Sequence, residues 1–197
     1  MQSTKTTTDT IYNLRLWTVE EYHRMAETGI LDNWEHVELL EGKIIWMSAK
    51  GTAHRSAVAR TDRLLQKRLG DFAMISVQDP ITLNDRSEPE PDIAVVKIDP
   101  LDYADHHPVP SEVYLIIEVA DSSLKFDCET KSKAYAQAEI KDYWVMEVVE
   151  RQLYIFREPT SDGYKSKVVL GEQETISPLQ FPDLQIGVKE ILPPTVV

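Results

Sequence analysis

Apolar residues recur along the chain with a helical spacing in three segments. Residues 52–69 carry one apolar stripe, which predicts a long amphipathic helix that ends at Gly70. Residues 18–27 begin with the pattern of a capping box and predict a short helix ended by glycine. A third helix is predicted over residues 126–138, with alanines and a tyrosine on its inner edge.

Shorter apolar stretches between these helices predict β-strands. Two of them, residues 92–98 and 112–120, are nearly continuous in Val, Ile and Leu, as in a sheet covered on both faces. Residues 99–111 between them carry three prolines and predict a loop. The other predicted strands are residues 36–40, 43–48, 72–77, 81–83, 143–149, 152–157 and 164–170. Together these elements predict an α/β fold with a mixed sheet flanked by helices.

The composition narrows the class of protein. With 42% hydrophobic residues the chain can form a core, and no apolar run approaches the ~20 residues of a membrane span. The first ten residues lack the apolar centre of a secretory signal. We therefore expect a frayed tail over residues 1–15, one domain over residues 16–197 and no membrane partner.

Charge and cysteine content limit partners and location. The net charge of −12 argues against strong non-specific binding to nucleic acid, although the field inside a cleft can differ from the total. The single cysteine, Cys128, excludes an internal disulfide and a Cys-based zinc cluster. We expect a cytoplasmic protein.

Two carboxylates stand out against the apolar strands. Glu118 interrupts residues 113–120, and a buried carboxylate needs a positive partner, a proton or a metal ion. Asp92 follows two prolines at the start of the other apolar strand. If the strands are neighbours, the two side chains project together, and two hard oxygen ligands suit Mg²⁺ or Mn²⁺ better than zinc. The simpler alternatives are a glutamate at a solvated strand end and an aspartate that caps a loop.

A lysine on the following helix completes this group. Lys131 and Lys133 are about 200° apart on an ideal helix, so at most one of them faces the carboxylates. Lys131 lies four residues before Tyr135, on the predicted inner side. A lysine at such a place can stabilise charge that builds on a phosphate oxygen. The alternative for either lysine is a solvated helix charge.

These residues resemble the PD-(D/E)XK nuclease superfamily: Pro91-Asp92, then the strand with Glu118, then a lysine on the next helix. The chain resembles more closely the Uma-two branch of restriction endonucleases. The further matching stretches are residues 18–22, 37–44, 87–96, 117–124, and Lys131 with Tyr135 ahead of residues 140–144. The resemblance covers roughly residues 16–192.

The resemblance implies a restriction-endonuclease-like fold, Mg²⁺ or Mn²⁺ as cofactor, DNA as substrate and phosphodiester hydrolysis. By this resemblance Asp92 and Glu118 are the metal ligands, Lys131 is the catalytic lysine and Glu38 is an additional carboxylate. The chain departs from the superfamily motif at Ala120, where the motif has its lysine. A homodimer is expected by analogy, because two cuts across a duplex suit a twofold arrangement.

Several other residues are weaker candidates. The candidates for supporting the site or contacting DNA are His54, Gln78 and Tyr135. The basic face of the long helix could lie along a DNA backbone or be merely solvated; it consists of Arg60, Arg63 and Lys67. The pair His106-His107 lies in the proline-flanked loop, and adjacent histidines do not easily converge on one ion.

Two hypotheses about function follow. The first is a metal-dependent DNA endonuclease. The second is a catalytically inactive nuclease-like module that binds a protein or nucleic acid partner, which would account for the acidic composition. Cleavage of DNA in the presence of Mg²⁺ or Mn²⁺ distinguishes the two.

Overall fold

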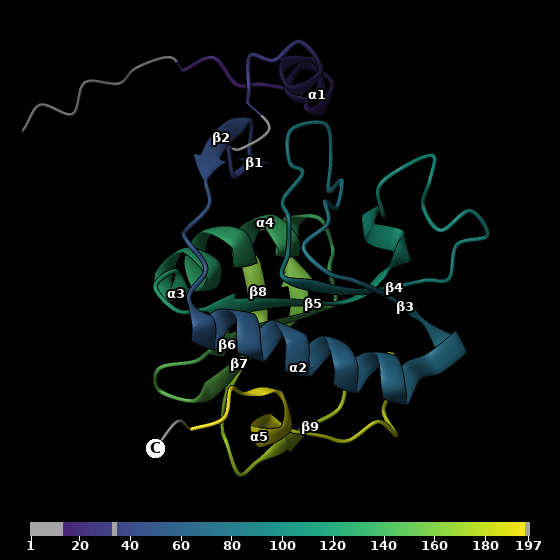
Figure 1. Ribbon diagram of the computed structural model, residues 1–197, viewed down its shortest axis with the longest axis vertical. Coiled ribbons are helices and arrows are strands. Elements are labelled where there is room, and N and C mark those ends of the chain that lie inside the picture. Colours follow the sequence, from purple (N-terminus) through teal and green to yellow (C-terminus); the bar gives the residue numbers. More distant parts are fainter. Residues whose placement is uncertain (1–13, 33–34, 196–197) are drawn as a thin grey trace, which may run out of the picture.

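A mixed β-sheet forms the centre of the computed structural model, which describes residues 14–32 and 35–195 (Figure 1). Its strands are β3 (Met74–Ser76), β4 (Ile93–Val96), β5 (Val113–Ala120), β6 (Asp142–Glu147), β7 (Gln152–Thr160) and β8 (Gly163–Gly171). They lie in the order β3-β4-β5-β6-β7-β8, with β5 and β6 parallel and the other neighbours antiparallel. The predicted mixed sheet is confirmed. Most of the predicted tail, residues 1–13, lies outside the described residues.

Helices cover both faces of this sheet. On one face lie α2 (Thr52–Leu69) and α5 (Val188–Ile191), next to the short pair β9 (Thr175–Ile176) and β10 (Ile186–Gly187). On the other lie α3 (Leu124–Phe126), the π-helical turn η3 (Asp127–Lys131) and α4 (Ser132–Gln137), which follow one another directly. Short 3₁₀ turns are η1 (Gly70–Phe72) and η2 (Pro110–Glu112). None of the helices within the described ranges is long and apolar enough to cross a membrane.

An N-terminal layer lies on the α4 side of the sheet and contains α1 (Val19–Glu27) and the hairpin of β1 (Val37–Leu40) and β2 (Lys43–Trp46) (Figure 1). The predicted capping box is present at the start of α1. The hairpin turns at Gly42, where φ is +75° and a Cβ atom would come within 2.7 Å of the Leu16 side chain. Glycine satisfies both conditions, so the layer packs closely.

Side chains alternate along β5 and separate the two faces of the sheet. Ile117 and Val119 pack into the apolar cluster beneath α2, whereas Ile116 and Ala120 pack into the cluster beneath α4. Because of this alternation, Glu118 lies on the same face of the sheet as Ile116 and Ala120. Its carboxylate therefore points toward α4 and β1.

One predicted strand does not form, and several others are shorter in the structure. Residues 81–83 form no strand: successive N–H groups donate to different partners, with Ile81 bonded to Pro89 and Thr82 to Pro108. The prolines lack an N–H group and cannot return the bond, so no regular ladder forms. The strand predicted at residues 72–77 shortens to β3, because Phe72 lies in η1.

The helix predicted over residues 126–138 is present but contains a π-helical turn, η3. The N–H group of Ser132 bonds to the carbonyl of Asp127, five residues earlier. Such turns are rare and frequently occur at functional sites. This turn ends at Lys131, whose side chain is only 7% exposed.

Candidate active site

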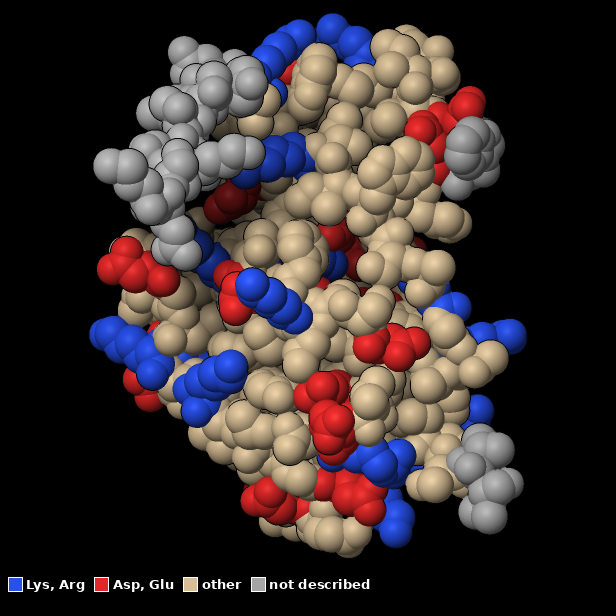
Figure 2. Space-filling view, turned by 90° about the vertical axis from the view of Figure 1, so that its left-hand side faces the viewer, with Lys and Arg blue, Asp and Glu red and all other residues tan. Residues whose placement is uncertain are grey.

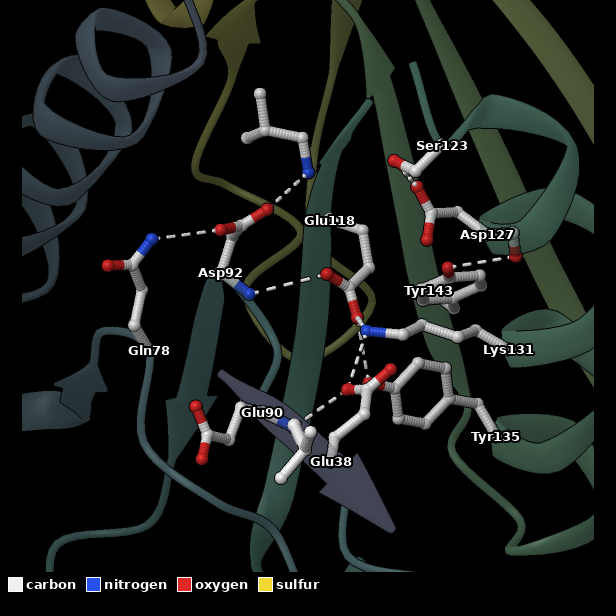
Figure 3. A network of polar contacts seen from close by, with 12 residues as sticks. Glu38, Gln78, Glu90, Asp92, Glu118, Ser123, Asp127, Lys131, Tyr135 and Tyr143 are labelled. Atoms are coloured by element: carbon white, nitrogen blue, oxygen red, sulfur yellow. Dashed lines mark hydrogen bonds and ion pairs between the residues drawn. The ribbon is translucent and has the colours of Figure 1, made fainter. Parts of the chain in front are cut away.

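Asp92 and Glu118 meet at one end of the sheet because β4 and β5 are antiparallel neighbours. Ile93 pairs with Ile117, which places Asp92 opposite Glu118. The N–H group of Asp92 points at Glu118 Oε2 from 3.4 Å, and the N–H group of Val119 donates to Asp92 Oδ2 at 2.9 Å. The structure thus brings together the two predicted metal ligands (Figure 3).

Three donors hold the Asp92 carboxylate. They are His54 Nε2 at 2.9 Å, Gln78 Nε2 at 3.0 Å and the Val119 N–H group. Burial alone would raise the pKa of Asp92, but the hydrogen bonds and the nearby His54 outweigh it and lower this pKa below its ordinary value. Asp92 is therefore ionised at neutral pH.

The backbone positions both side-chain donors. His54 lies in the first turn of α2, whose N-cap Gly51 lies so close to Asp121 that a Cβ atom would be 2.7 Å from its carboxylate. Gln78 has φ of +59°, a backbone conformation that is unfavourable for residues other than glycine. Its own N–H group bonds to the Asp92 carbonyl at 3.2 Å. Such local strain is typical of functional sites.

Glu118 belongs to a second group of contacts, with Lys131 at its centre. The Lys131 ammonium donates to Glu118 Oε1 at 3.0 Å and lies 2.9 Å from Glu38 Oε2 on β1. Tyr135, one turn further along the helix, donates its hydroxyl to Glu118 Oε1 at 2.9 Å. The side chains of Glu38 and Glu118 are 2% and 5% exposed. All four side chains meet in one buried network (Figure 3).

Negative charge exceeds positive charge in this network. Burial raises the pKa of Glu118 to about 8; the nearby Lys131 opposes the shift, and the carboxylates of Asp127, Asp92 and Glu38 add to it. Burial disfavours the Lys131 ammonium, but the carboxylates of Glu118, Glu38 and Asp127 more than compensate and raise its pKa. A single ammonium group therefore balances the charge of several carboxylates. A buried acidic group of this kind favours an added cation or proton.

The donor set fits a hard divalent cation. Carboxylate oxygens are the ligands that Mg²⁺ and Mn²⁺ prefer. Among the described residues, Glu118 Oε2 receives only the long contact from the Asp92 N–H group, so this oxygen retains capacity for another bond. The carboxylates open onto a cleft of about 250 Å³.

Glu90 and Asp127 are among the acidic residues of this cleft that sequence reasoning missed. Burial and neighbouring carboxylates, Glu38 among them, raise the pKa of both. Glu90 lies two residues before Asp92 in an extended, proline-containing segment, so the two share one side. Asp127 precedes Lys131 by four residues on the predicted helix. These spacings were signals that could have identified both residues.

The basic residues of α2 lie away from the cleft lining. The guanidinium group of Arg60 points toward α5, with Nη2 3.4 Å from the Lys189 carbonyl oxygen. Arg63 and Lys67 are exposed further along α2. Acidic and basic side chains are interspersed on the side of the molecule shown in Figure 2. The described residues on this side thus show no broad basic patch.

Comparison with protein families gives a match over nearly the whole chain. The model of the Uma2 (Uma-two) family, described as "Putative restriction endonuclease", matches residues 19–189. The chain belongs to this family. The resemblance stated from the sequence is thereby confirmed. Comparison with curated proteins finds no match for this Uma2 protein.

A solved structure shares the fold. It is the crystal structure of a "putative nuclease belonging to DUF820" from Anabaena variabilis, which superimposes with a TM-score of 0.69 at 15% sequence identity. The match covers 88% of the Uma2 protein and 96% of the other chain. The predicted nuclease-like α/β fold is therefore confirmed.

Proposed function

We propose that this Uma2 protein is a divalent-metal-dependent endonuclease of the PD-(D/E)XK type that hydrolyses DNA phosphodiester bonds in the cleft. One observation carries the proposal: Asp92 and Glu118 face each other across β4 and β5 within a buried acidic group that contains Lys131. The family description and the nuclease-like fold support the class of reaction.

In this proposal Asp92 and Glu118 hold Mg²⁺ or Mn²⁺, with Glu38 as an additional carboxylate. A bound divalent cation would supply Lewis-acid polarisation of the phosphate and lower the pKa of a water molecule. His54 and Gln78 keep Asp92 ionised and oriented through their hydrogen bonds. Tyr135 orients Glu118 by its hydroxyl bond to Oε1 and leaves Oε2 toward Asp92.

Lys131 is proposed to stabilise negative charge on the phosphate. Its ammonium is kept protonated by Glu118 and Glu38 and is fixed between them, so little reorganisation is needed when charge develops nearby. Its place on the helix compensates for Ala120 on β5, where the superfamily motif has a lysine. The exposed Arg63 and Lys67, with Arg60 beside them, are proposed to contact the DNA backbone outside the cleft.

The decisive experiment measures cleavage of duplex and single-stranded DNA by purified protein with Mg²⁺, with Mn²⁺ and with EDTA. We expect cleavage that requires the metal, is abolished in Asp92→Asn and is strongly reduced in Lys131→Met. The control is Lys133→Met, which removes an exposed lysine from the same helix and should cleave like the wild type. Equal residual cleavage in all variants would indicate a contaminant and favour the inactive binding module.

We also propose that the active form is a homodimer, because cuts in both strands of a duplex suit two related sites. Light scattering coupled to size-exclusion chromatography would measure the mass of the species in solution. A monomer that cuts both strands would contradict this arrangement.

A further inference from the structure

Two histidines and a buried glutamate converge outside the cleft. His23 lies on α1, Glu88 lies in the segment between β3 and β4, and His107 lies in the loop between β4 and β5. One ligand atom from each lies within 4.8 Å of the other two. We propose that these residues bind a divalent transition-metal ion of the Zn²⁺ class.

The charge around Glu88 supports a cation at this place. Its side chain is 2% exposed, and in the described part of the chain its ion-pair partner is His23, with Nε2 2.5 Å from Oε1. No lysine or arginine of the described residues forms an ion pair with it. The other oxygen accepts a hydrogen bond from the Thr82 hydroxyl at 2.6 Å. A buried carboxylate is costly without a positive partner, and a metal ion would provide one.

The ligand chemistry favours zinc over magnesium. Two imidazoles and one carboxylate form a ligand set that binds Zn²⁺ and leaves a further position for water. The cleft instead offers carboxylate oxygens, which suit Mg²⁺ or Mn²⁺. The two groups should therefore select different ions.

The separations allow coordination after small side-chain rotations. With metal–ligand bonds of about 2.1 Å, two ligand atoms lie at most about 4.2 Å apart. The three ligand atoms lie within 4.8 Å of one another, so the longest separation exceeds this value by less than an ångström, and the 2.5 Å contact between His23 and Glu88 would open to admit the ion. His23 is 44% exposed and His107 is only partly buried, so both rings have room to turn. Glu88, which is buried, would be the fixed ligand.

The two neighbouring histidines of the loop have different surroundings. His106 bonds to Asp105 at 2.7 Å and lies 3.4 Å from Glu112, whereas the ring of His107 is 6.1 Å from that of His23. The sequence argument considered only the adjacent pair. It overlooked the partners that His107 acquires from other segments.

A metal ion at this site would join three segments close to the cleft. The N–H group of Glu88 bonds to the Leu39 carbonyl at 2.8 Å, next to Glu38, and Glu88 precedes Asp92 by four residues. In Figure 1 the segment between β3 and β4 rises beside the hairpin toward α1. The ion would thus fasten α1 and the β4–β5 loop to the segments that carry two cleft carboxylates.

The test is a Co²⁺ titration of EDTA-treated protein without a histidine tag, followed by visible absorption and by competition with Zn²⁺. We expect one Zn²⁺ site in the wild type in addition to any binding in the cleft, with affinity at least about 100-fold weaker in His107→Gln and His23→Gln, because each loses a direct ligand. His106→Gln is the matched control and should bind as tightly as the wild type. Glu118→Gln should also retain the site, since its change lies in the cleft.

Equal affinity in all variants, loss of the site in Glu118→Gln, or no binding by the wild type would each overturn the proposal. Circular dichroism of the metal-free variants checks that they fold. If His23→Gln does not fold, the test relies on His107→Gln, which lies in a loop and should fold like the wild type. Zn²⁺ should also raise the melting temperature of the wild type but not that of His107→Gln. These readouts need no DNA cleavage, so their outcome is independent of the proposed nuclease activity.

Discussion

The two faces of the central sheet differ in chemistry although the same strands form both. Beneath α2 the sheet is covered by apolar side chains, and Leu65, Ile117 and Trp144 are completely buried there. On the opposite face β5 places Glu118 beside Lys131 within the protein. The first face is suited to stability, and the second retains charge that costs stability. Substitutions on the two faces should therefore change different properties.

The largest expected effect is the loss of turnover in Glu118→Gln. The amide can still accept hydrogen bonds from Lys131 and Tyr135, but it lacks the charge of a metal ligand. We expect DNA cleavage to fall by at least about 10³-fold, because the bound ion supplies several kcal/mol to the transition state. The free energy of unfolding should change by no more than about 1 kcal/mol. Glu150→Gln, at an exposed turn, is the control; cleavage by Glu118→Gln at the wild-type rate would contradict the assignment.

The reverse pattern is expected on the α2 face. Leu65→Ala removes a completely buried side chain, and such cavities lower the free energy of unfolding by about 2–5 kcal/mol. Cleavage per folded molecule should stay at the wild-type level. Urea denaturation measures the loss, with the partly buried Leu64→Ala as a milder comparison. A large loss of turnover in folded Leu65→Ala would show that the two faces are not separable in this way.

The charged face should also respond to pH. The pKa of Glu118 is raised to about 8 from 4.5, so the folded protein binds the extra proton between these values. Without metal, the contribution of this Glu118 proton to the free energy of unfolding is therefore complete below about pH 4.5. It is lost as the pH rises toward about 8. The raised pKa values of Glu90 and Asp127 act in the same direction.

Metal affinity should show the opposite slope, because a cation must displace this proton. We expect Mn²⁺ affinity to rise between about pH 6 and 8, by at most about tenfold per unit for one proton. Calorimetric titrations at several pH values measure the rise, and Glu118→Gln should reduce it. An affinity that is independent of pH in the wild type would contradict the protonated state of Glu118.

The smallest expected effect concerns the outer surface of α2. Arg63→Gln should weaken DNA binding only modestly, and the slope of log affinity against log salt should decrease by about 0.9 if one phosphate contact is lost. The exposed Arg24→Gln on α1 serves as the control. Identical salt dependence in Arg63→Gln and the wild type would mean that this face of α2 is only solvated.

Much of the fold was predictable because its signals are local. The apolar stripe and the closing glycine of residues 52–69 predict the bounds of α2, and the capping box at Thr18 predicts the start of α1. Polar residues that interrupt apolar strands likewise identified Asp92 and Glu118 as candidates. Their side-by-side placement needed only the assumption that two apolar strands are neighbours.

Other features depend on contacts between distant segments, which periodicity does not encode. Residues 81–83 form no strand because their N–H groups bond to two proline carbonyls from separate segments. The π-helical turn that ends at Lys131 also depends on tertiary packing. Only the folded chain brings His107 beside His23 and Glu88. The sequence by itself determined the main helices, most strands of the central sheet and two of the anomalous carboxylates. The tertiary structure decided how those carboxylates are compensated, because the compensating groups come from elements far away along the chain.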